Sequence, residues 1–404
     1  MLRAVKFPTE HLEFDLAVLG DGAIGMATAI EYARRNPDAR VAVVAPAGRR
    51  DGASTAAGLM LNAFGELEPG QLERPGGQAR FALARRALRT WPTWLEELGE
   101  LAGTTPPSIR QGTVILAPTG DVTIDVIAQA LAQEHEPHIR ISPADIPGYS
   151  PTPEHAAEMA IFLPREGAIP AAQVMALMDR AAANSSIARI EGRAQAIAHA
   201  PGRSTVELED SRTLWARSVL VAAGAWSSAI IDSIPELSAR CPRVHFGTGR
   251  AYHVTHAADD PSPRPRTVLR LPNHPSGGSY HLVPFDDNSA YVGASNHVSA
   301  TPEPDPLHAA FALEDVADHL RIELKNAQVR PVHGHRPISS DGMPLIGRTD
   351  LEGIFLATGT RRDGFTSAPV IARDLVCEML LGKPMLDPVF KPDRSHTPDL
   401  ASIP

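Results

Sequence analysis

Cysteine is scarce in this chain: Cys241 and Cys377 are the only two in 404 residues. They form no CxxC pair, so no cysteine-based metal or redox motif is expected, and we interpret both as buried thiols in a reducing, cytoplasmic compartment. The sequence also lacks any run of about eighteen apolar residues, so we expect no membrane span. Residues 1–14 contain no apolar segment of the kind found in secretory signals, and we expect none.

Positive charge is not in excess either. The chain has 38 Lys and Arg against 47 Asp and Glu, a net charge of −9, and both signs are mixed along the sequence. This argues against a nucleic-acid-binding surface. The hydrophobic fraction of 43% is typical of a globular protein, and the length allows two or three domain-sized units. These bulk properties do not indicate an oligomeric state.

A strand-turn-helix-strand pattern lies near the N-terminus. Residues 15–20 (DLAVLG) form an apolar run that ends in a glycine-rich turn at 20–25. A helix is predicted from about 24 to 35, and a second strand covers 40–45 (RVAVVA). This order is typical of the first βαβ unit of a dinucleotide-binding, Rossmann-like domain.

The glycines of the turn have distinct physical roles. Gly20 permits the tight turn, Gly22 lets the main chain approach a pyrophosphate, and Gly25 allows close packing of the helix on the strand. The helix begins near Ala23 and Ile24, where free amides and the positive end of the helix dipole favour phosphate binding.

The second strand does not end in the acidic residue expected to bind ribose. Ala45 stands there, followed by Arg49, Arg50 and Asp51, which are candidates for contact with the adenosine end of a dinucleotide. An arginine at this place also suits a 2′-phosphate, so the segment leaves NADP open and does not choose the cofactor.

The rest of the chain predicts a second unit. Small residues recur at 54–58 (STAAG) and, after an apolar strand, at 223–226 (AGAW). Ligands of open α/β sheets bind at such carboxyl ends of strands. From about 243 to 330 the chain alternates in strand-like runs, which predicts a mainly antiparallel sheet and a platform for substrate. The expected fold class is therefore α/β, with a Rossmann-like domain and an antiparallel second domain.

Taken together, the motifs resemble those of the D-amino-acid oxidase and glycine oxidase group of FAD-dependent oxidoreductases. Six segments occur in the order of that family: GDGAIGMATA (20–29), STAAG (54–58), REGAIPAAQV (165–174), VLVAAGAWSS (219–228), GHRPISSDGMPLIG (334–347) and ATGTRRDGFTSAP (357–369).

This resemblance implies FAD as the cofactor. Residues 338–346 contain no cysteine for covalent attachment, so we expect non-covalent FAD. It also implies a discontinuous FAD-binding domain at 14–95, 152–242 and 331–395, with 96–151 and 243–330 forming the substrate-binding domain. Besides the residues of the first turn and Ala45, Arg49 and Arg50, the expected cofactor contacts are Ser54, Thr55, Ala57, Gly58, Leu59, Ala194, Ala223, Gly224, Trp226, Arg336, Gly359, Arg362, Asp363, Gly364, Phe365 and Thr366.

The resemblance further suggests substrate-site residues. Arg336 matches the arginine that holds a substrate carboxylate in such enzymes, and a guanidinium offers two parallel donors for that purpose. An arginine that forms a salt bridge within the fold is the alternative. Arg362 matches a second basic position, and Arg361 is the less favoured neighbour. Further candidates from this region are His281, His335 and Tyr252, with Arg250, His253 and Tyr280 as other polar residues of the predicted platform.

The activity that the resemblance implies is oxidation of an amine or amino acid, with hydride transfer to flavin N5, an imine product, and reoxidation by oxygen to give hydrogen peroxide. Three alternatives stay open at this point. The chain is a dehydrogenase that passes electrons to a quinone or carrier, an FAD-binding subunit of an amine-oxidising complex, or a tailoring enzyme for an unusual amine.

Overall fold

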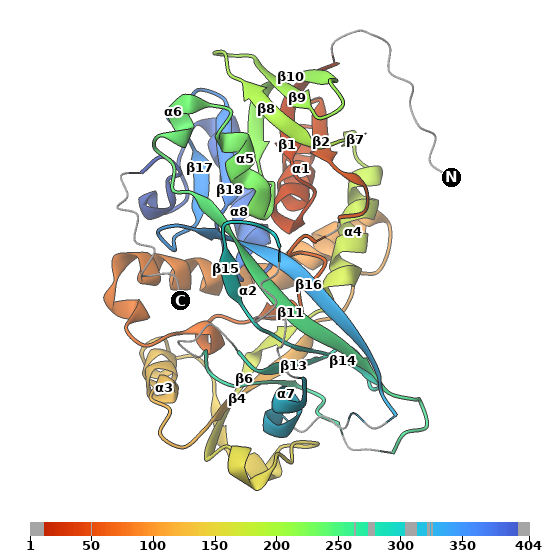
Figure 1. The fold of residues 1–404 in the computed structure, drawn as a ribbon, viewed down its shortest axis with the longest axis vertical. Coiled ribbons are helices and arrows are strands. Elements are labelled where there is room, and N and C mark those ends of the chain that lie inside the picture. The colour runs from red at the N-terminus through yellow and green to blue at the C-terminus, as the bar shows by residue number, and fades with distance from the viewer. Residues whose placement is uncertain are drawn as a thin grey trace.

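Two β-sheets organise the computed structural model of this chain, which describes residues 12–394 except 50, 262–263, 274–278, 304–312, 321–323 and 325. In Figure 1 the first sheet lies in the upper half of the molecule, and the long strands of the second sheet cross below it. The described residues place eight strands in the first sheet and ten in the second.

The first sheet is mainly parallel. Its strands follow the order β17-β18-β10-β1-β2-β7, with β9 paired to the edge of β10 and β8 paired to β9. The bounds are β1 Leu12–Leu19, β2 Val41–Ala45, β7 Ile187–Glu191, β8 Ala194–Ala198, β9 Ser204–Leu208, β10 Thr213–Val221, β17 Leu345–Arg348 and β18 Ile354–Thr358. This sheet confirms the predicted Rossmann-like βαβ unit.

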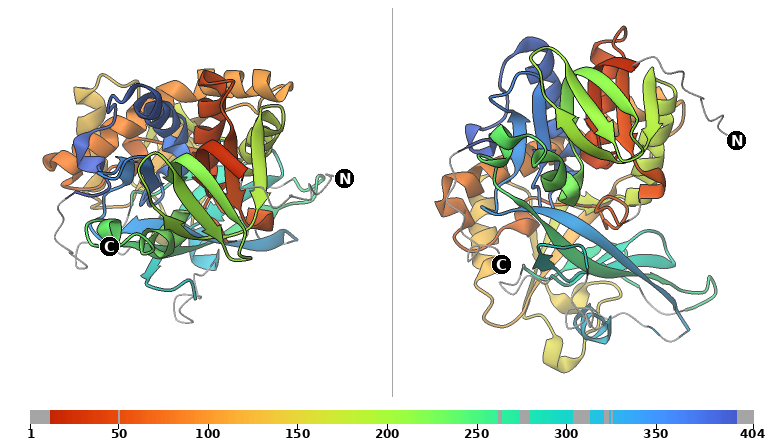
Figure 2. Two further views of the ribbon diagram at one scale, coloured as in Figure 1. Left: turned by 90° about the horizontal axis from the view of Figure 1, so that it is seen from above. Right: turned by 45° about the horizontal axis from the view of Figure 1, so that its top comes forward.

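Alternation along the strands creates two cores, because successive side chains of a strand point to opposite faces. Leu16 and Val18 of β1 pack against the helices of one face, whereas Ala17 and Leu19 pack on the other. The helices of the first face are α1 (Ala23–Arg35), α2 (Pro75–Ala102), α4 (Ala171–Ala183) and α8 (Gly364–Leu381). The opposite face carries the β8–β9 hairpin with α5 (Ser227–Ile231) and α6 (Pro235–Ser238), as Figure 2 shows from two directions.

The second sheet follows the order β15-β11-β14-β13-β12-β4-β6-β3, with β16 paired to β11 and β5 to β6. Its pairs are antiparallel except for β12 with β4, so the prediction of a mainly antiparallel second sheet is confirmed. The bounds are β3 Met60–Leu61, β4 Arg110–Ala117, β5 Ile139–Ile141, β6 Met159–Ala168, β11 Val244–Thr255, β12 Val268–Arg270, β13 His281–Pro284, β14 Ser289–Gly293, β15 His297–Ser299 and β16 Gln328–Ser339; α3 (Thr123–Gln133) and α7 (Leu313–Leu320) lie beside it.

Three strands of the second sheet come from segments that we expected in the FAD-binding domain, and the first of them is β3, within the segment 14–95. β6 lies within the segment 152–242, and most of β16 lies within 331–395. β16 pairs with β11 along its whole length, and its C-terminal part passes beside the first sheet (Figure 1). One consequence is that Arg336 of β16 stands at the junction of the two sheets. In the part of the chain described here, no helix is long and apolar enough to span a membrane.

Candidate active site

The turn between β1 and α1 and the helix start that follows have no room for a side chain at Gly20 or Gly25. A Cβ on Gly20 would lie 2.3 Å from the carbonyl oxygen of Ala222, and its φ of +120° favours glycine. A Cβ on Gly25 would lie 2.1 Å from the carbonyl oxygen of Gly20. The absence of a Cβ at these two glycines allows α1 to begin directly beside the turn, with the amides of its first residues near the end of β1.

One cavity begins at this turn and extends to the second sheet. Its wall contains these residues predicted from the sequence: Gly20, Gly22, Ala23, Ile24, Ala45, Arg49, Ser54, Thr55, Ala57, Gly58, Leu59, Ala194, Ala223, Gly224, Trp226, His281, His335, Arg336, Arg362, Asp363, Gly364, Phe365 and Thr366. Residues from the two ends of the chain therefore line a single cavity. Arg50 lies outside the described residues.

Three predicted site residues do not line the cavity. Gly25 lies below the turn, where it is needed for packing rather than for contact with a ligand. Gly359 has a φ of +70° and packs against β16 and β17, which makes it a structural glycine. Tyr252 packs against the core of the second sheet, because alternation along β11 turns its ring away from the cavity. The tyrosine in the cavity wall is Tyr291 of β14, which no sequence motif marks.

Arg49 is committed to carboxylates at the adenosine end of the predicted site. Its guanidinium donates to both carboxylate oxygens of Asp179 at 2.7 and 2.6 Å, and it pairs with Asp21 at 2.9 Å. Arg189 bridges the same two aspartates at 2.7 Å each. Two arginines thus balance two aspartates, so Arg49 stabilises the loop after β2 and carries no surplus charge for a 2′-phosphate. Arg193, which we did not predict, also lines this end and pairs with Glu209 at 3.3 Å.

The small residues after β2 are required by close approach of the chain to the second sheet. A Cβ on Gly58 would lie 2.7 Å from the Tyr291 ring. A Cβ on Gly334 of β16 would lie 2.6 Å from the Ala56 Cβ, and the His335 amide donates to the Asp51 carbonyl at 2.9 Å. The segment 52–58 therefore packs closely against β14 and β16, and it lines the cavity.

Arg336 is placed in the cavity wall by the pairing of β16 with β11. A Cβ on Gly249 of β11 would lie 2.2 Å from Arg336 Nη1, so the guanidinium rests over a strand position that must be glycine. Nη1 donates to the Ser295 carbonyl at 3.0 Å and to Asn296 Oδ1 at 3.1 Å. Burial lowers its pKa. No carboxylate among the described residues pairs with Arg336, so its charge lines the cavity with hydrogen-bond partners but no ion pair from those residues.

His281 and Tyr291 form an uncharged wall next to Arg336. The two rings stack with centroids 5.7 Å apart. Burial, and then the positive charge of Arg270, lower the pKa of His281 to about 3, and burial raises the pKa of Tyr291. His281 is therefore a neutral imidazole and Tyr291 a neutral phenol at ordinary pH. Neither His281 Nδ1 nor the hydroxyl of Ser279 has a hydrogen-bond partner among the described residues.

His335 occupies a different wall from its neighbour Arg336, because adjacent residues of a strand face opposite ways. Its ring packs edge-on against Trp226 and Phe246, with each pair of centroids 5.5 Å apart. Its Nδ1 lies 3.0 Å from the Thr248 hydroxyl. Burial lowers its pKa. The geometry makes His335 part of an aromatic cluster at the cavity wall.

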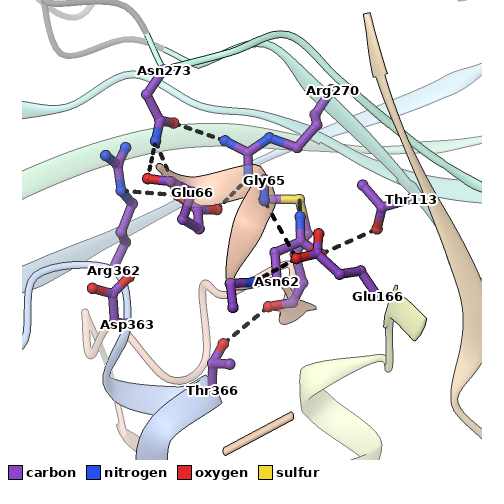
Figure 3. Close-up of polar contacts among 12 residues, drawn as sticks. Asn62, Gly65, Glu66, Thr113, Glu166, Arg270, Asn273, Arg362, Asp363 and Thr366 are labelled. Carbon is purple, nitrogen blue, oxygen red and sulfur yellow. Dashed lines mark hydrogen bonds and ion pairs between the residues drawn. The ribbon is translucent and has the colours of Figure 1, made fainter. Parts of the chain in front are cut away.

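Arg362 belongs to a partly buried network of charges, shown in Figure 3. It pairs with Glu66 at 3.2 Å and forms a second ion pair with Glu68. Glu66 also pairs with Arg270, and Asn273 hydrogen-bonds to both of them. Burial raises the pKa of Glu66, but the charges of Arg270 and Arg362 lower it to about 2. The Arg362 guanidinium is thus held in the protein by two carboxylates.

The short turn that carries Glu66 is fixed by a buried carboxylate, Glu166 of β6. Its Oε1 accepts hydrogen bonds from the amides of Ala63 and Phe64 at 2.8 and 2.7 Å, and from that of Gly65 at 3.3 Å. Burial raises its pKa to about 7, and these three hydrogen bonds oppose the rise. Glu166 positions the turn, and the turn positions Arg362.

The cavity fits a flavin dinucleotide at several points. The glycine turn leaves the first amides of α1 next to the cavity, and Ser54 Oγ, which also lines it, accepts from the Ala23 amide at 3.0 Å. At the far end Gly364 to Ser367, the first turn of α8, also line it. Both helix termini favour negative charge. Neither cysteine lines the cavity, and Cys241 is buried elsewhere.

Comparison with known proteins agrees with this geometry. The family signature described as FAD dependent oxidoreductase (DAO) matches residues 15–378. Glycine oxidase of Geobacillus kaustophilus is 26% identical over 379 residues, which cover 90% of this chain and 93% of that protein.

Solved structures show the same fold. The crystal structure of glycine oxidase from Geobacillus kaustophilus has a TM-score of 0.81 at 23% identity and covers 96% of this chain and 100% of its own. That of iminodiacetate oxidase from a Chelativorans species has a TM-score of 0.75 at 22% identity, covering 94% of this chain and 100% of its own. The predicted family is confirmed by the signature that spans most of the sequence: this chain belongs to the DAO family of FAD-dependent oxidoreductases, and its cofactor is FAD.

Proposed function

We propose that this protein oxidises the C–N bond of an amino acid, with oxygen as the electron acceptor and hydrogen peroxide as a product. The observation that carries the proposal is Arg336, a half-buried guanidinium in the cavity wall that no described carboxylate neutralises. Such a cation suits the carboxylate of an amino acid, because two parallel N–H donors fix both its position and its angle. The similarity to glycine oxidase supports the same substrate class.

FAD supplies the hydride acceptor when it is bound. The chain's own residues would hold it along the cavity: the turn at Gly20–Gly22 and the first amides of α1 at the pyrophosphate, and the first turn of α8 at the flavin end. Arg49 is neutralised by Asp21 and Asp179, so main-chain groups around Ala45, which line the cavity, would contact the ribose.

The proton chemistry follows from the ionisation of the wall. His335 is engaged with Thr248 and Trp226 on another wall, and its pKa is lowered. Apart from His335 and the arginines, the described ionisable side chains near Arg336 are His281 with a pKa of about 3, Glu66 with a pKa of about 2, and Tyr291 with a raised pKa. None of them is a base with a pKa near neutrality. The substrate amine therefore loses its proton to water before reaction, and the neutral wall of His281 and Tyr291 favours the uncharged amine.

An anaerobic screen tests the proposal. Glycine, N-methylglycine, and D- and L-amino acids are mixed with the FAD-loaded protein, and loss of flavin absorbance is recorded. At least one of them should bleach the flavin, and admission of air should restore the colour with one hydrogen peroxide per substrate.

Two results would refute parts of the proposal. If no amine bleaches the flavin, the chain is not an amino-acid oxidase. If bleaching occurs but air restores the colour slowly, whereas a quinone or dye restores it fast, the acceptor is not oxygen.

A further inference from the structure

The cavity wall contains more positive charge than the fold neutralises. Six arginines line it in the described part of the chain: Arg49, Arg80, Arg193, Arg336, Arg361 and Arg362. Four of them pair with carboxylates, namely Arg49, Arg80, Arg193 and Arg362. Arg336 and Arg361 have no ion pair with any described residue, and only Arg336 is explained by the carboxylate of an amino acid.

Arg361 lies close to the same end of the cavity as Arg336. Its amide donates to the carbonyl oxygen of Pro337, the residue after Arg336, at 2.8 Å. Arg336, Arg361 and Arg362 all line the cavity, and the hydrogen bond to Pro337 holds the main chain of Arg361 beside the strand that carries Arg336. Burial comes first among the causes that lower the pKa of Arg361 to about 10, followed by the charges of Arg362 and Arg80, and the carboxylates of Glu68 and Asp363 oppose the fall only in part.

The backbone at Arg361 is also unusual. Its φ is +52°, a conformation that costs about 1 kcal/mol for a residue other than glycine, asparagine or aspartate. Partly burying a cation that forms no ion pair adds a further cost, which the charges of Glu68 and Asp363 offset only in part. Neighbouring Arg80 and Arg362 avoid this cost by pairing with Asp363, Glu66 and Glu68. A ligand that brings its own negative charge would remove the cost of leaving the Arg361 cation without an ion pair.

We propose that Arg361 binds a second anionic group of the substrate, so that the substrate is an amino acid that carries two carboxylates. The inference rests on the proposed function, in which Arg336 binds the first carboxylate. Arg361 is then the residue that determines specificity, because a substrate with one carboxylate leaves the half-buried Arg361 guanidinium without an ion pair.

Equilibrium binding tests the inference separately from turnover. The probes are two dianions, oxydiacetate and succinate, each with a matched monoanion, methoxyacetate and butyrate. Binding to the FAD-loaded protein is followed by titration calorimetry. At least one dianion should bind about tenfold more tightly than its monoanion, the scale of one charge-assisted contact in a partly buried site.

The variants Arg361→Met and Arg361→Lys locate the effect. Arg361→Met should abolish the preference for the dianion, and Arg361→Lys should retain part of it. Arg89→Met, an exposed position of α2 outside the cavity wall, is the matched control and should keep the full preference.

The outcomes are distinct from those of the amine screen. Equal binding of both dianions and their monoanions by the native protein overturns the inference, even if the Arg361 variants fail to fold. If Arg361→Met keeps the preference for the dianion, the inference is overturned as well, because Arg361 does not bind the second carboxylate. If Arg361→Met loses affinity for FAD instead of the preference, the inference is also overturned, because Arg361 then binds the cofactor. Absence of flavin bleaching by amines refutes the oxidase proposal alone.

Discussion

The Glu166→Gln variant should gain stability relative to the native chain as the pH rises, because the native chain loses stability on ionisation of Glu166 and the variant does not. Glu166 is 2% exposed, and only its Oε1 has hydrogen-bond partners; Oε2 has none among the described residues. Burial raises its pKa from 4.5 to about 7. The folded state therefore binds a proton that the unfolded chain releases between these two pH values. The stability that this proton gives is fully present below pH 4.5 and is lost as the pH rises through 7.

The size of the effect follows from the shift. Each pKa unit corresponds to about 1.4 kcal/mol, so ionising Glu166 in the folded protein costs about 3 kcal/mol in total. Between pH 5 and pH 8 the linkage relation gives about 2.5 kcal/mol of lost stability. Glutamine keeps a carbonyl oxygen for the amides of the turn and does not ionise, so the Glu166→Gln variant does not lose this amount.

Thermal unfolding of the FAD-loaded native protein and the Glu166→Gln variant at pH 5 and pH 8 measures this difference in stability. A chain of this length has an unfolding entropy near 0.85 kcal/mol/K, so the difference in Tm between variant and native protein should grow by about 3 °C from pH 5 to pH 8. Glu158→Gln, at an exposed carboxylate, is the control and should show no such growth. A Tm difference for Glu166→Gln that is the same at both pH values would refute the argument that Glu166 ionises at a cost inside the fold.

Three further predictions concern the site. The Gly25→Ala variant should fail to retain FAD, because its Cβ would lie 2.1 Å from the Gly20 carbonyl oxygen and displace the turn; a full flavin absorbance in the purified variant would contradict this. The Arg336→Leu variant should raise KM for amino-acid substrates about 30-fold, the equivalent of about 2 kcal/mol for a charged hydrogen-bond pair, whereas exposed Arg348→Leu should not; steady-state kinetics decide. The kcat/KM should rise with pH along the pKa of the substrate amine, since His281 and Glu66 have pKa values of about 3 and 2. An inflection at the same pH for two amines of different pKa would show that a protein base governs the rate instead.

The sequence by itself determined the cofactor unit and the family. The glycine turn is recognisable because its requirements are local: each glycine is dictated by contacts within one strand, one turn and the helix that follows. The alternation of β11–β16 also predicted an antiparallel second sheet, since a period of two is a property of neighbouring residues. The resemblance brought together residues near 20 and near 360, which line one cavity in the structure.

Only the tertiary structure decided which charges are free. Arg361 and Arg362 are adjacent and chemically identical, and we favoured Arg362 for the substrate. The structure pairs Arg362 with Glu66 and Glu68, about 300 residues away in the chain, and leaves Arg361 without an ion pair in the described part of the molecule. Likewise, only the structure shows that Tyr291 lines the cavity, whereas we had expected Tyr252 there. An ion pair or a cavity wall is a meeting of distant segments, and the local pattern of either segment contains no information about its partner.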